Sequence, residues 1–267
     1  MQDVKINSSF SININSKTMK KLIIFILVAF TMTKLWSQDP FLFEEPKTSE
    51  PKNIPLIGDP APSFVAQSTS GEIKFPGDYG KSWKILFSHP QDFTPVCTSE
   101  LLELANLQDQ FDKLGVKILA ISTDRLTTHE QWKKAMEGMS YKDRKPVNIE
   151  FPLVADEDLS ISKEYGMIPS TSETTKDVRG VFIIDPDNVI QAVYFYPMTV
   201  GRNTDELVRM VTALEKTKSE RVMTPANWKA GDDVLIHSIP NSNASKEELS
   251  QEGLYNLAWF MWYKKAN

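Results

Sequence analysis

The chain has 267 residues, of which 41% are hydrophobic, 24% charged and 10% aromatic. This composition is typical of a globular protein and excludes a disordered chain, which would hold too little apolar surface to fold. The formal net charge is −5 and the sequence has no block of lysine and arginine, so neither nucleic acid nor an anionic membrane surface is expected as a partner.

The N-terminal region has the layout of an export signal. Residues 1–18 are polar and are interpreted as an upstream extension, whereas residues 19–37 have two adjacent lysines near their start, followed by the apolar run Leu22–Phe30 and a tolerable cleavage site. We therefore expect an exported protein, periplasmic or secreted, with no stable membrane binding once the signal is removed. The alternative is a protein anchored in the membrane by an uncleaved signal. Residues 38–53, with three prolines, are predicted to be a linker.

From residue 54 onward, short apolar runs alternate with amphipathic stretches. A hairpin is expected around Pro186-Asp187-Asn188, whose residue types favour a tight turn. The alternation predicts an α/β fold with a mixed sheet. The predicted strands are 83–88, 116–122, 151–155, 178–185 and 189–196, and the predicted helices are 101–114, 128–139, 159–165 and 203–218.

The composition changes at about Val222, where a small C-terminal unit is expected to begin. Its segment Leu254–Tyr263 is rich in aromatic residues, which must pack against another apolar surface. The predicted domains are therefore 54–221 and 222–267.

Cys97 is the only cysteine, and it lies between the predicted strand 83–88 and the predicted helix 101–114. A thiol in the first turn of a helix faces unpaired backbone N–H groups, which stabilise the nucleophilic thiolate. A single cysteine forms no internal disulfide. Its position alone leaves two interpretations open, a reactive thiol and a buried cysteine that only packs.

Two neighbours of the cysteine add to the first interpretation. Thr94 precedes Cys97 by three residues, close enough in a tight turn for its hydroxyl and the sulfur to contact one small ligand. Pro90 and Pro95 stiffen the loop between strand and helix and limit its access to solvent.

The run from Pro90 to Cys97, PQDFTPVC, matches the pattern P-x-x-x-T-x-x-C. It resembles the signature of the peroxiredoxin family, and its surroundings are similar to the one-cysteine, peroxiredoxin-6 type subfamily. Further similar stretches are residues 178–182, 196–203 and 222–228, so the resemblance extends over about 54–233. It implies a thioredoxin-like fold with a mixed central sheet and a small C-terminal domain that packs at the interface of a homodimer.

The resemblance implies that Cys97 is the peroxidatic cysteine, whose thiolate attacks a hydroperoxide and becomes sulfenic acid. Thr94 would hold the peroxide, and Arg179 would stabilise both the thiolate and the developing negative charge. Arg202 would support this geometry from nearby, together with Pro90. For each arginine taken alone, a surface ion pair is the simpler interpretation.

The three histidines give weaker signals. His89 directly precedes Pro90 and resembles a histidine that lies close to the cysteine in this subfamily, so it is expected to have a supporting role; a structural histidine is the alternative. His129 and His237 have no such setting. With three histidines and one cysteine, neither a metal site nor a bound cofactor is expected.

The expected function is reduction of hydrogen peroxide and small organic hydroperoxides. Because no second cysteine is present, an external thiol or another small reductant must reduce the sulfenic acid. The alternative is an exported, non-catalytic oligomer, a holdase or scaffold, in which Cys97 only packs.

A lipid-hydrolysing activity described for some members of the subfamily is not expected. Its serine corresponds to Ser82, but Lys84 replaces the second glycine of the G-x-S-x-G-like motif and Pro76 replaces the histidine; Asp187 matches the aspartate. A serine without a base is a poor nucleophile.

Overall fold

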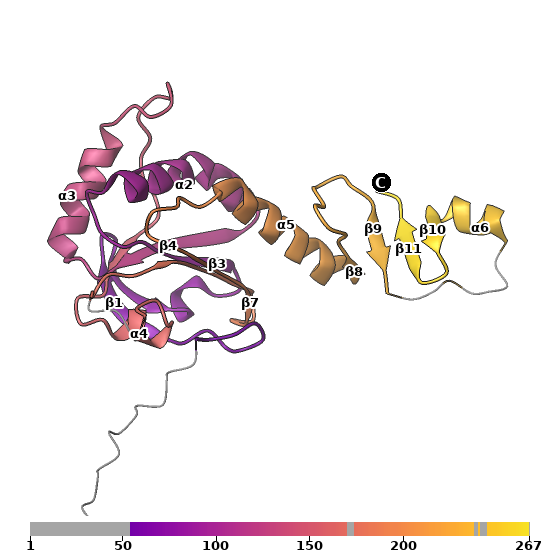
Figure 1. Ribbon diagram of the computed structural model, residues 1–267, viewed down its shortest axis with the longest axis horizontal. Helices are drawn as coiled ribbons and strands as arrows, with labels where there is room; N and C mark the ends of the chain where they lie inside the picture. The colour runs from indigo at the N-terminus through magenta and orange to yellow at the C-terminus, as the bar shows by residue number, and fades with distance from the viewer. Residues whose placement is uncertain (1–53, 170–173, 238–239, 241–244, 267) are drawn as a thin grey trace, which may run out of the picture. The chain divides into compact units, whose positions relative to one another are not determined.

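The computed structural model describes residues 54–169, 174–237, 240 and 245–266 (Figure 1). The predicted extension, signal peptide and linker lie outside the described residues. Within the described residues, none of the helices combines the length and the hydropathy that crossing a bilayer requires. The strands of the described residues form two sheets, of seven and four strands.

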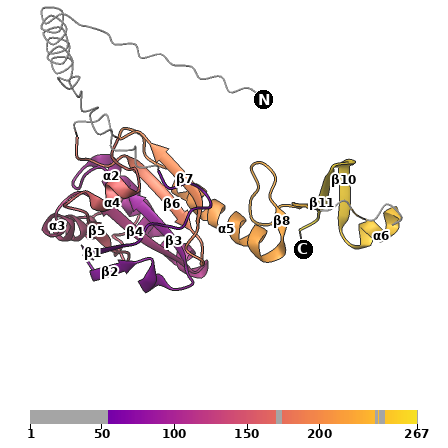
Figure 2. The same ribbon diagram turned by 90° about the horizontal axis from the view of Figure 1, so that it is seen from below.

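The larger sheet is mixed, as predicted. Its order is β2-β1-β5-β4-β3-β6-β7; β3, β4 and β5 are parallel, whereas the other pairs are antiparallel. Figure 2 shows these strands side by side. Their bounds are Phe64–Ser68 for β1, Gly71–Phe75 for β2, Trp83–Ser88 for β3, Val116–Ser122 for β4, Leu153–Ala155 for β5, Arg179–Ile184 for β6 and Ile190–Tyr196 for β7.

Continuous apolar runs form the centre of this sheet. All six residues of β3 are buried, because helices cover both faces of the strand. The hairpin of β1 and β2 was not predicted from the sequence, since its residues alternate between buried and exposed positions and include several polar ones. An apolar run was the signal for the other strands, and this hairpin has none.

Helices pack on both faces of the sheet (Figure 1). One face is covered by α2 (Pro95–Lys113), α3 (Leu126–Glu137) and α5 (Thr204–Glu220), which share a core with β3, β4 and β6. The other face is covered by α4 (Ser160–Glu164) and the residues that follow it, with the short helix η1 (Gly77–Tyr79) nearby. This arrangement is the thioredoxin-like fold expected from the resemblance.

Helix α2 begins at Pro95, six residues earlier than predicted. The prediction followed the apolar spacing, which starts at Leu101. Thr94 is the N-cap and Pro95 is the first helical residue, where a missing N–H costs nothing. Cys97 is therefore the third residue of the helix rather than a residue of the loop before it.

The smaller sheet has the order β10-β11-β9-β8 and contains the aromatic segment. Trp228, which is buried, packs against Ala213 of α5 and against Val222 and Val234. At the turn between β10 and β11, Trp259 and Phe260 are 75% and 67% exposed. The elements are β8 (Val222–Met223), β9 (Val234–Ile236), helix α6 (Lys246–Gln251), β10 (Leu254–Ala258) and β11 (Met261–Lys264).

Candidate active site

Cys97 lies in the first turn of α2 and its residue is fully buried. The backbone N–H groups of a first helical turn have no partners within the helix, and they point toward the side where negative charge is favoured. This is the setting that the sequence predicted for the thiol, now placed at the core face of the helix, which contacts the strands of the large sheet.

Arg179 is the residue that contacts the sulfur. Its Nη1 donates a hydrogen bond to Cys97 Sγ over 3.2 Å. Its Nε and Nη2 donate to the carbonyl oxygen of Met198 over 2.9 and 2.6 Å, so the guanidinium is held from two sides. Arg179 opens strand β6, next to β3, and the sheet therefore brings it across to the helix that follows β3. A buried guanidinium at this distance stabilises a thiolate.

Glu100 joins the two predicted arginines, a role that sequence reasoning missed. Its Oε2 accepts from Arg179 Nη1 and Arg202 Nη2, both over 2.7 Å. Its Oε1 accepts from Arg202 Nε over 2.9 Å and from the Arg202 backbone N–H over 2.8 Å. All three side chains are at most 3% exposed. The available signal was its spacing, three residues after Cys97 on the same helix.

Arg202 bonds Glu100, which in turn bonds the arginine beside the sulfur. Arg202 Nη1 also donates to the carbonyl oxygens of Ser88 and Gly180, over 2.7 and 2.8 Å, and its guanidinium lies 3.2 Å from the centre of the Phe87 ring. Burial lowers the pKa of Arg202, although its bonds with Glu100 oppose the shift. The surface ion pair that was the alternative for both arginines is excluded by this burial.

Thr94 and Pro90 shape the loop before the helix. Thr94 Oγ1 donates to the carbonyl oxygen of Gln91 over 2.8 Å, which leaves the hydroxyl's lone pairs available to accept from a ligand. Pro90 is buried directly after β3. Between them, Phe93 has a φ of 54°, unusual for a residue with a side chain, and is 56% exposed.

The rim of the site is apolar. Met198 and Val200, 43% and 47% exposed, belong to the segment whose carbonyl holds Arg179. A Cβ atom on Gly201 would lie 3.5 Å from Val96 in the first turn of α2, so this segment passes beside the helix terminus. The exposed ring of Phe93 lies on the loop that carries Thr94.

His89 belongs to a buried cluster that the sequence did not reveal. Its Nε2 bonds Asp92 Oδ1 over 2.8 Å, and His129 Nδ1 bonds Asp92 Oδ2 over 2.7 Å. Burial lowers the pKa of His89, so its ring is neutral. Burial would raise the pKa of Asp92, but the bonds from His129 and His89 outweigh it and leave that pKa below its usual range. His129 Nε2 also lies 3.1 Å from the carbonyl oxygen of Val154.

The partners of the two rings differ. Both ring nitrogens of His129 face acceptors, the Asp92 carboxylate and the Val154 carbonyl. His89 Nε2 donates to Asp92, and His89 Nδ1 has no hydrogen-bond partner within the described residues. One ligand atom from each of the three residues lies within 4.8 Å of the others, but those atoms already bond one another. We therefore assign a hydrogen-bonded cluster here and not a metal centre.

The residues considered for lipid hydrolysis do not form a catalytic set. Asp187 pairs with Lys81 and Lys218, both over 2.9 Å, and these bonds lower its pKa to about 2. Lys84 is fully buried and donates to the Gly80 carbonyl and to Asn188 over 3.0 and 2.6 Å. Both side chains are thus engaged in contacts with residues other than Ser82, and neither is bonded to it as a catalytic base would be.

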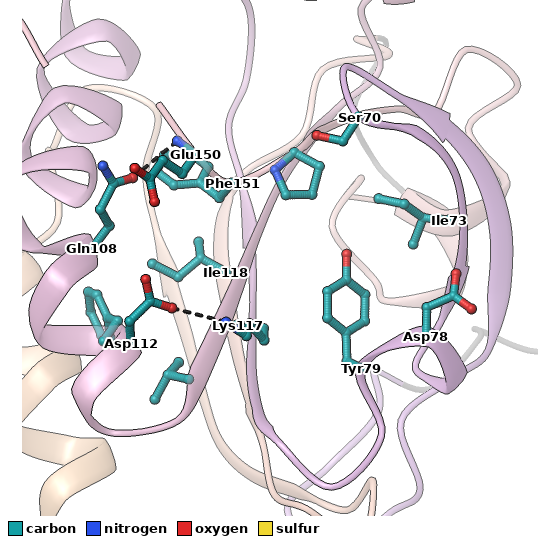
Figure 3. A pocket seen from close by; sticks show the side chains of 13 residues that line it. Ser70, Ile73, Asp78, Tyr79, Gln108, Asp112, Lys117, Ile118, Glu150 and Phe151 are labelled. Atoms are coloured by element: carbon teal, nitrogen blue, oxygen red, sulfur yellow. Dashed lines mark hydrogen bonds and ion pairs between the residues drawn. The ribbon is translucent and has the colours of Figure 1, made fainter. Parts of the chain in front are cut away.

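A pocket of about 420 Å³ lies apart from the predicted site residues, none of which lines it (Figure 3). It opens where the ladder between β4 and β5 ends. The first pair of this ladder is Ala120 with Leu153, and Pro152, just before Leu153, has no N–H to donate to β4. Figure 3 shows Tyr79 across from Ile118, and Asp112 and Lys117 form an ion pair over 3.0 Å at its edge.

Comparisons with known proteins show which family the chain is similar to. A family model described as the AhpC/TSA family matches residues 57–193, and one described as the C-terminal domain of 1-Cys peroxiredoxin matches residues 213–251. A peroxiredoxin of Methanosarcina mazei is 45% identical over 79% of this chain and 98% of its own length. Peroxiredoxin-6 of Gallus gallus is 42% identical over 72% of this chain and 87% of its own.

Among solved structures, the chain is similar to the yeast mitochondrial 1-Cys peroxiredoxin, with a TM-score of 0.68 and 35% identity over 79% of this chain and 99% of that one. That structure is described as giving the basis of the thiol resolving mechanism via glutathione/thioredoxin systems.

Proposed function

The chain belongs to the peroxiredoxin family, and on that premise we propose how its residues carry out the reaction. As a member with a single cysteine it is a thiol-dependent peroxidase of the 1-Cys type. The exported holdase or scaffold is not favoured, because it gives no reason for the buried charges around the thiol.

In the proposed first step, the Cys97 thiolate attacks one oxygen of the hydroperoxide. A sulfur–oxygen bond forms while the oxygen–oxygen bond breaks, and the departing oxygen takes a proton from solvent water to leave as water or an alcohol. Arg179 donates toward the sulfur and is placed to stabilise the charge that develops on the oxygens. Thr94 Oγ1 is placed to accept from the peroxide, since its own proton is directed to Gln91.

One observation carries this proposal: a buried thiol at a helix N-terminus receives a hydrogen bond from an arginine that a buried glutamate and a backbone carbonyl hold in place. A cysteine that only packs needs no charged partner. Burying two arginines and a carboxylate costs free energy, and packing alone gives no reason to place them beside the thiol.

The test is rapid mixing of the reduced protein with hydrogen peroxide, followed by a sulfenic-acid probe and intact mass. We expect stoichiometric labelling that is lost in Cys97→Ser and retained in Ser99→Ala. Ser99 lies in the same turn, and its hydroxyl donates to the Val96 carbonyl over 2.7 Å. A wild-type thiol that reacts no faster than free cysteine would contradict the proposal.

We further propose an external thiol as reductant. It attacks the sulfenic sulfur, releases water and forms a mixed disulfide, which a second thiol then reduces to regenerate the Cys97 thiolate. Cys97 is the only cysteine of the chain, so no internal thiol competes for this step. Turnover with glutathione or with a thioredoxin system would distinguish the donors.

We also propose a homodimer. The end of β10 and the turn after it expose Leu257, Trp259 and Phe260 to 67% or more, a surface that a second copy would cover. Sedimentation of the wild type should give a dimer that Trp259→Ser weakens. A wild-type monomer at every concentration tested would contradict this proposal.

Export remains a proposal that the pattern of residues 19–37 supports. N-terminal sequencing of the protein from its native cells would give a start near residue 38 if the signal is removed. An intact N-terminus in the membrane fraction would favour the anchored alternative.

A further inference from the structure

Asp177 is a buried carboxyl group that the reaction does not use. It lies two residues before Arg179 and is fully buried. Neither of its side-chain oxygens has a hydrogen-bond partner within the described part of the chain. The hydroxyl of Ser162, on helix α4, is near enough to Asp177 to lower its pKa, yet it too is buried without a well-formed hydrogen bond within the described residues. Buried polar groups are nearly always paired, so such a residue calls for a reason.

The surroundings of Asp177 are acidic. Within the described residues, the charged groups that act on it are Asp156, before α4, and Asp124, after β4. The cations on its own segment are engaged elsewhere, Lys176 with Gln91 and Arg179 with Glu100. Burial raises the pKa of Asp177 to about 8; the two aspartates add to this, while Ser162 opposes it without overcoming burial. At neutral pH the group is therefore an uncharged acid.

The segment that carries Asp177 is bonded to the active-site loop on one side and to the sheet on the other. Lys176 Nζ donates to the side-chain oxygen of Gln91, and the backbone carbonyl oxygen of Gln91 accepts from Thr94 Oγ1. Val178 donates its N–H to Met167 over 2.8 Å and accepts from Ser88 Oγ over 2.7 Å. A shift of this segment would thus displace both Arg179 and the loop of Thr94.

We propose that Asp177 is a positioning residue that holds residues 174–178, and through them Arg179 and the Thr94 loop, only while its carboxyl group keeps its proton. When base removes that proton to water, a third negative charge joins Asp156 and Asp124 in the interior, and the segment moves toward solvent. Reaction of Cys97 with peroxide then slows. This inference rests on the proposed function, because Arg179 and Thr94 matter only if Cys97 is the nucleophile.

The test measures the rate of Cys97 oxidation by hydrogen peroxide from pH 6 to 10. We expect the wild-type rate to fall above about pH 8, approaching roughly a tenfold loss for each further pH unit. Asp177→Asn, which mimics the protonated acid, should keep its rate across this range. Asp158→Asn is the control, since Asp158 is an exposed aspartate nearby, and it should follow the wild type. The same alkaline fall in Asp177→Asn and wild type would overturn the inference.

A second measurement does not depend on activity. The folded pKa of Asp177 lies above its ordinary value of 3.8, so its contribution to stability is complete below about pH 4 and is lost as pH rises to about 8. Asp177→Asn should therefore gain stability over the wild type between these values and hold a constant advantage above pH 8. If the difference in the free energy of unfolding between Asp177→Asn and the wild type were the same at pH 5 and at pH 9, the inference would be overturned.

Hydrogen exchange covers the case in which Asp177→Asn does not fold. In the wild type, the amides of residues 174–180 should lose protection between pH 7 and pH 9, after correction for base catalysis, while those of α5 do not. Unchanged relative protection would count against the inference. A wild-type Cys97 that reacts slowly with hydrogen peroxide at pH 6.5 would instead contradict the peroxidase proposal. The stability and hydrogen-exchange measurements would still test the inference, because neither depends on activity.

Discussion

Glu100, which bonds Arg179, and Asp177, which precedes Arg179 by two residues, are buried carboxyl groups that differ in their partners. Glu100, 3% exposed, accepts four hydrogen bonds, from the guanidinium groups of two arginines and from one backbone N–H. Asp177, fully buried, faces two other aspartates. The comparison teaches that burial sets the cost of a charge, whereas its partners decide whether the charge persists. Glu100 accepts from two arginines, whereas burial beside two aspartates raises the pKa of Asp177.

The largest effect is expected from removing the charge at Glu100. Glu100→Gln keeps the shape but places an amide N–H₂ group against two guanidinium groups, which leaves buried positive charges unpaired. The free energy of unfolding should fall by roughly 3–5 kcal/mol. Urea unfolding measures it, with Glu103→Gln as the control, because Glu103 pairs with Lys142 and Arg144 one turn along α2 but is 20% exposed. Equal losses of unfolding free energy in Glu100→Gln and Glu103→Gln would show that burial does not raise the cost of an unpaired charge here.

The next effect concerns the reaction rate. Arg179→Met removes the donor to Cys97 Sγ while Arg202 still pairs with Glu100. The rate constant for oxidation of Cys97 should fall by roughly 10²–10³-fold, as when one donor to a developing oxyanion is lost. Arg179→Lys should recover only part of the rate, because a lysine lacks the planar fork that reaches both the sulfur and the Met198 carbonyl.

The control for this prediction is Arg144→Met, which removes an arginine that is 37% exposed and distant in role from the thiol. It should leave the rate unchanged. If Arg179→Met reacted as fast as this control, the guanidinium would serve only to neutralise Glu100, and the sulfur would owe its reactivity to the helix terminus alone.

The sequence predicts those parts of the fold that depend on neighbours along the chain. Strand β3, the hairpin of β6 and β7, and the helix after Cys97 follow from apolar runs, turn residues and three-to-four spacing. The β1 and β2 hairpin escaped because one of its faces is exposed. The start of α2 was predicted too late because the apolar period begins only at Leu101. Thr94 and Pro95, which signal a helix cap, mark the true start.

The site was predictable only in part. The resemblance marked Cys97, Thr94, Arg179 and Arg202 by motif, without their contacts. Glu100 meets its arginine partners 79 and 102 positions along the chain, and His129 reaches Asp92 across 37 positions. No local period reports such contacts. Asp177 is harder still, because what sets it apart is that its side-chain oxygens have no hydrogen-bond partner among the described residues.

Asp187 gives the smallest expected effect and isolates burial from pairing. Like Glu100 it has two cationic partners, Lys81 and Lys218, but its side chain is 58% exposed. Its pKa is lowered to about 2 by those bonds, so its contribution to stability is present above about pH 4 and is lost between there and pH 2. At pH 7, Asp187→Asn should unfold at nearly the same urea concentration as the wild type, because water screens exposed pairs and added salt weakens them further. A loss as large as that of Glu100→Gln would mean that pairing acts alike in water and in the interior, and the contrast between Glu100 and Asp177 would then need another cause.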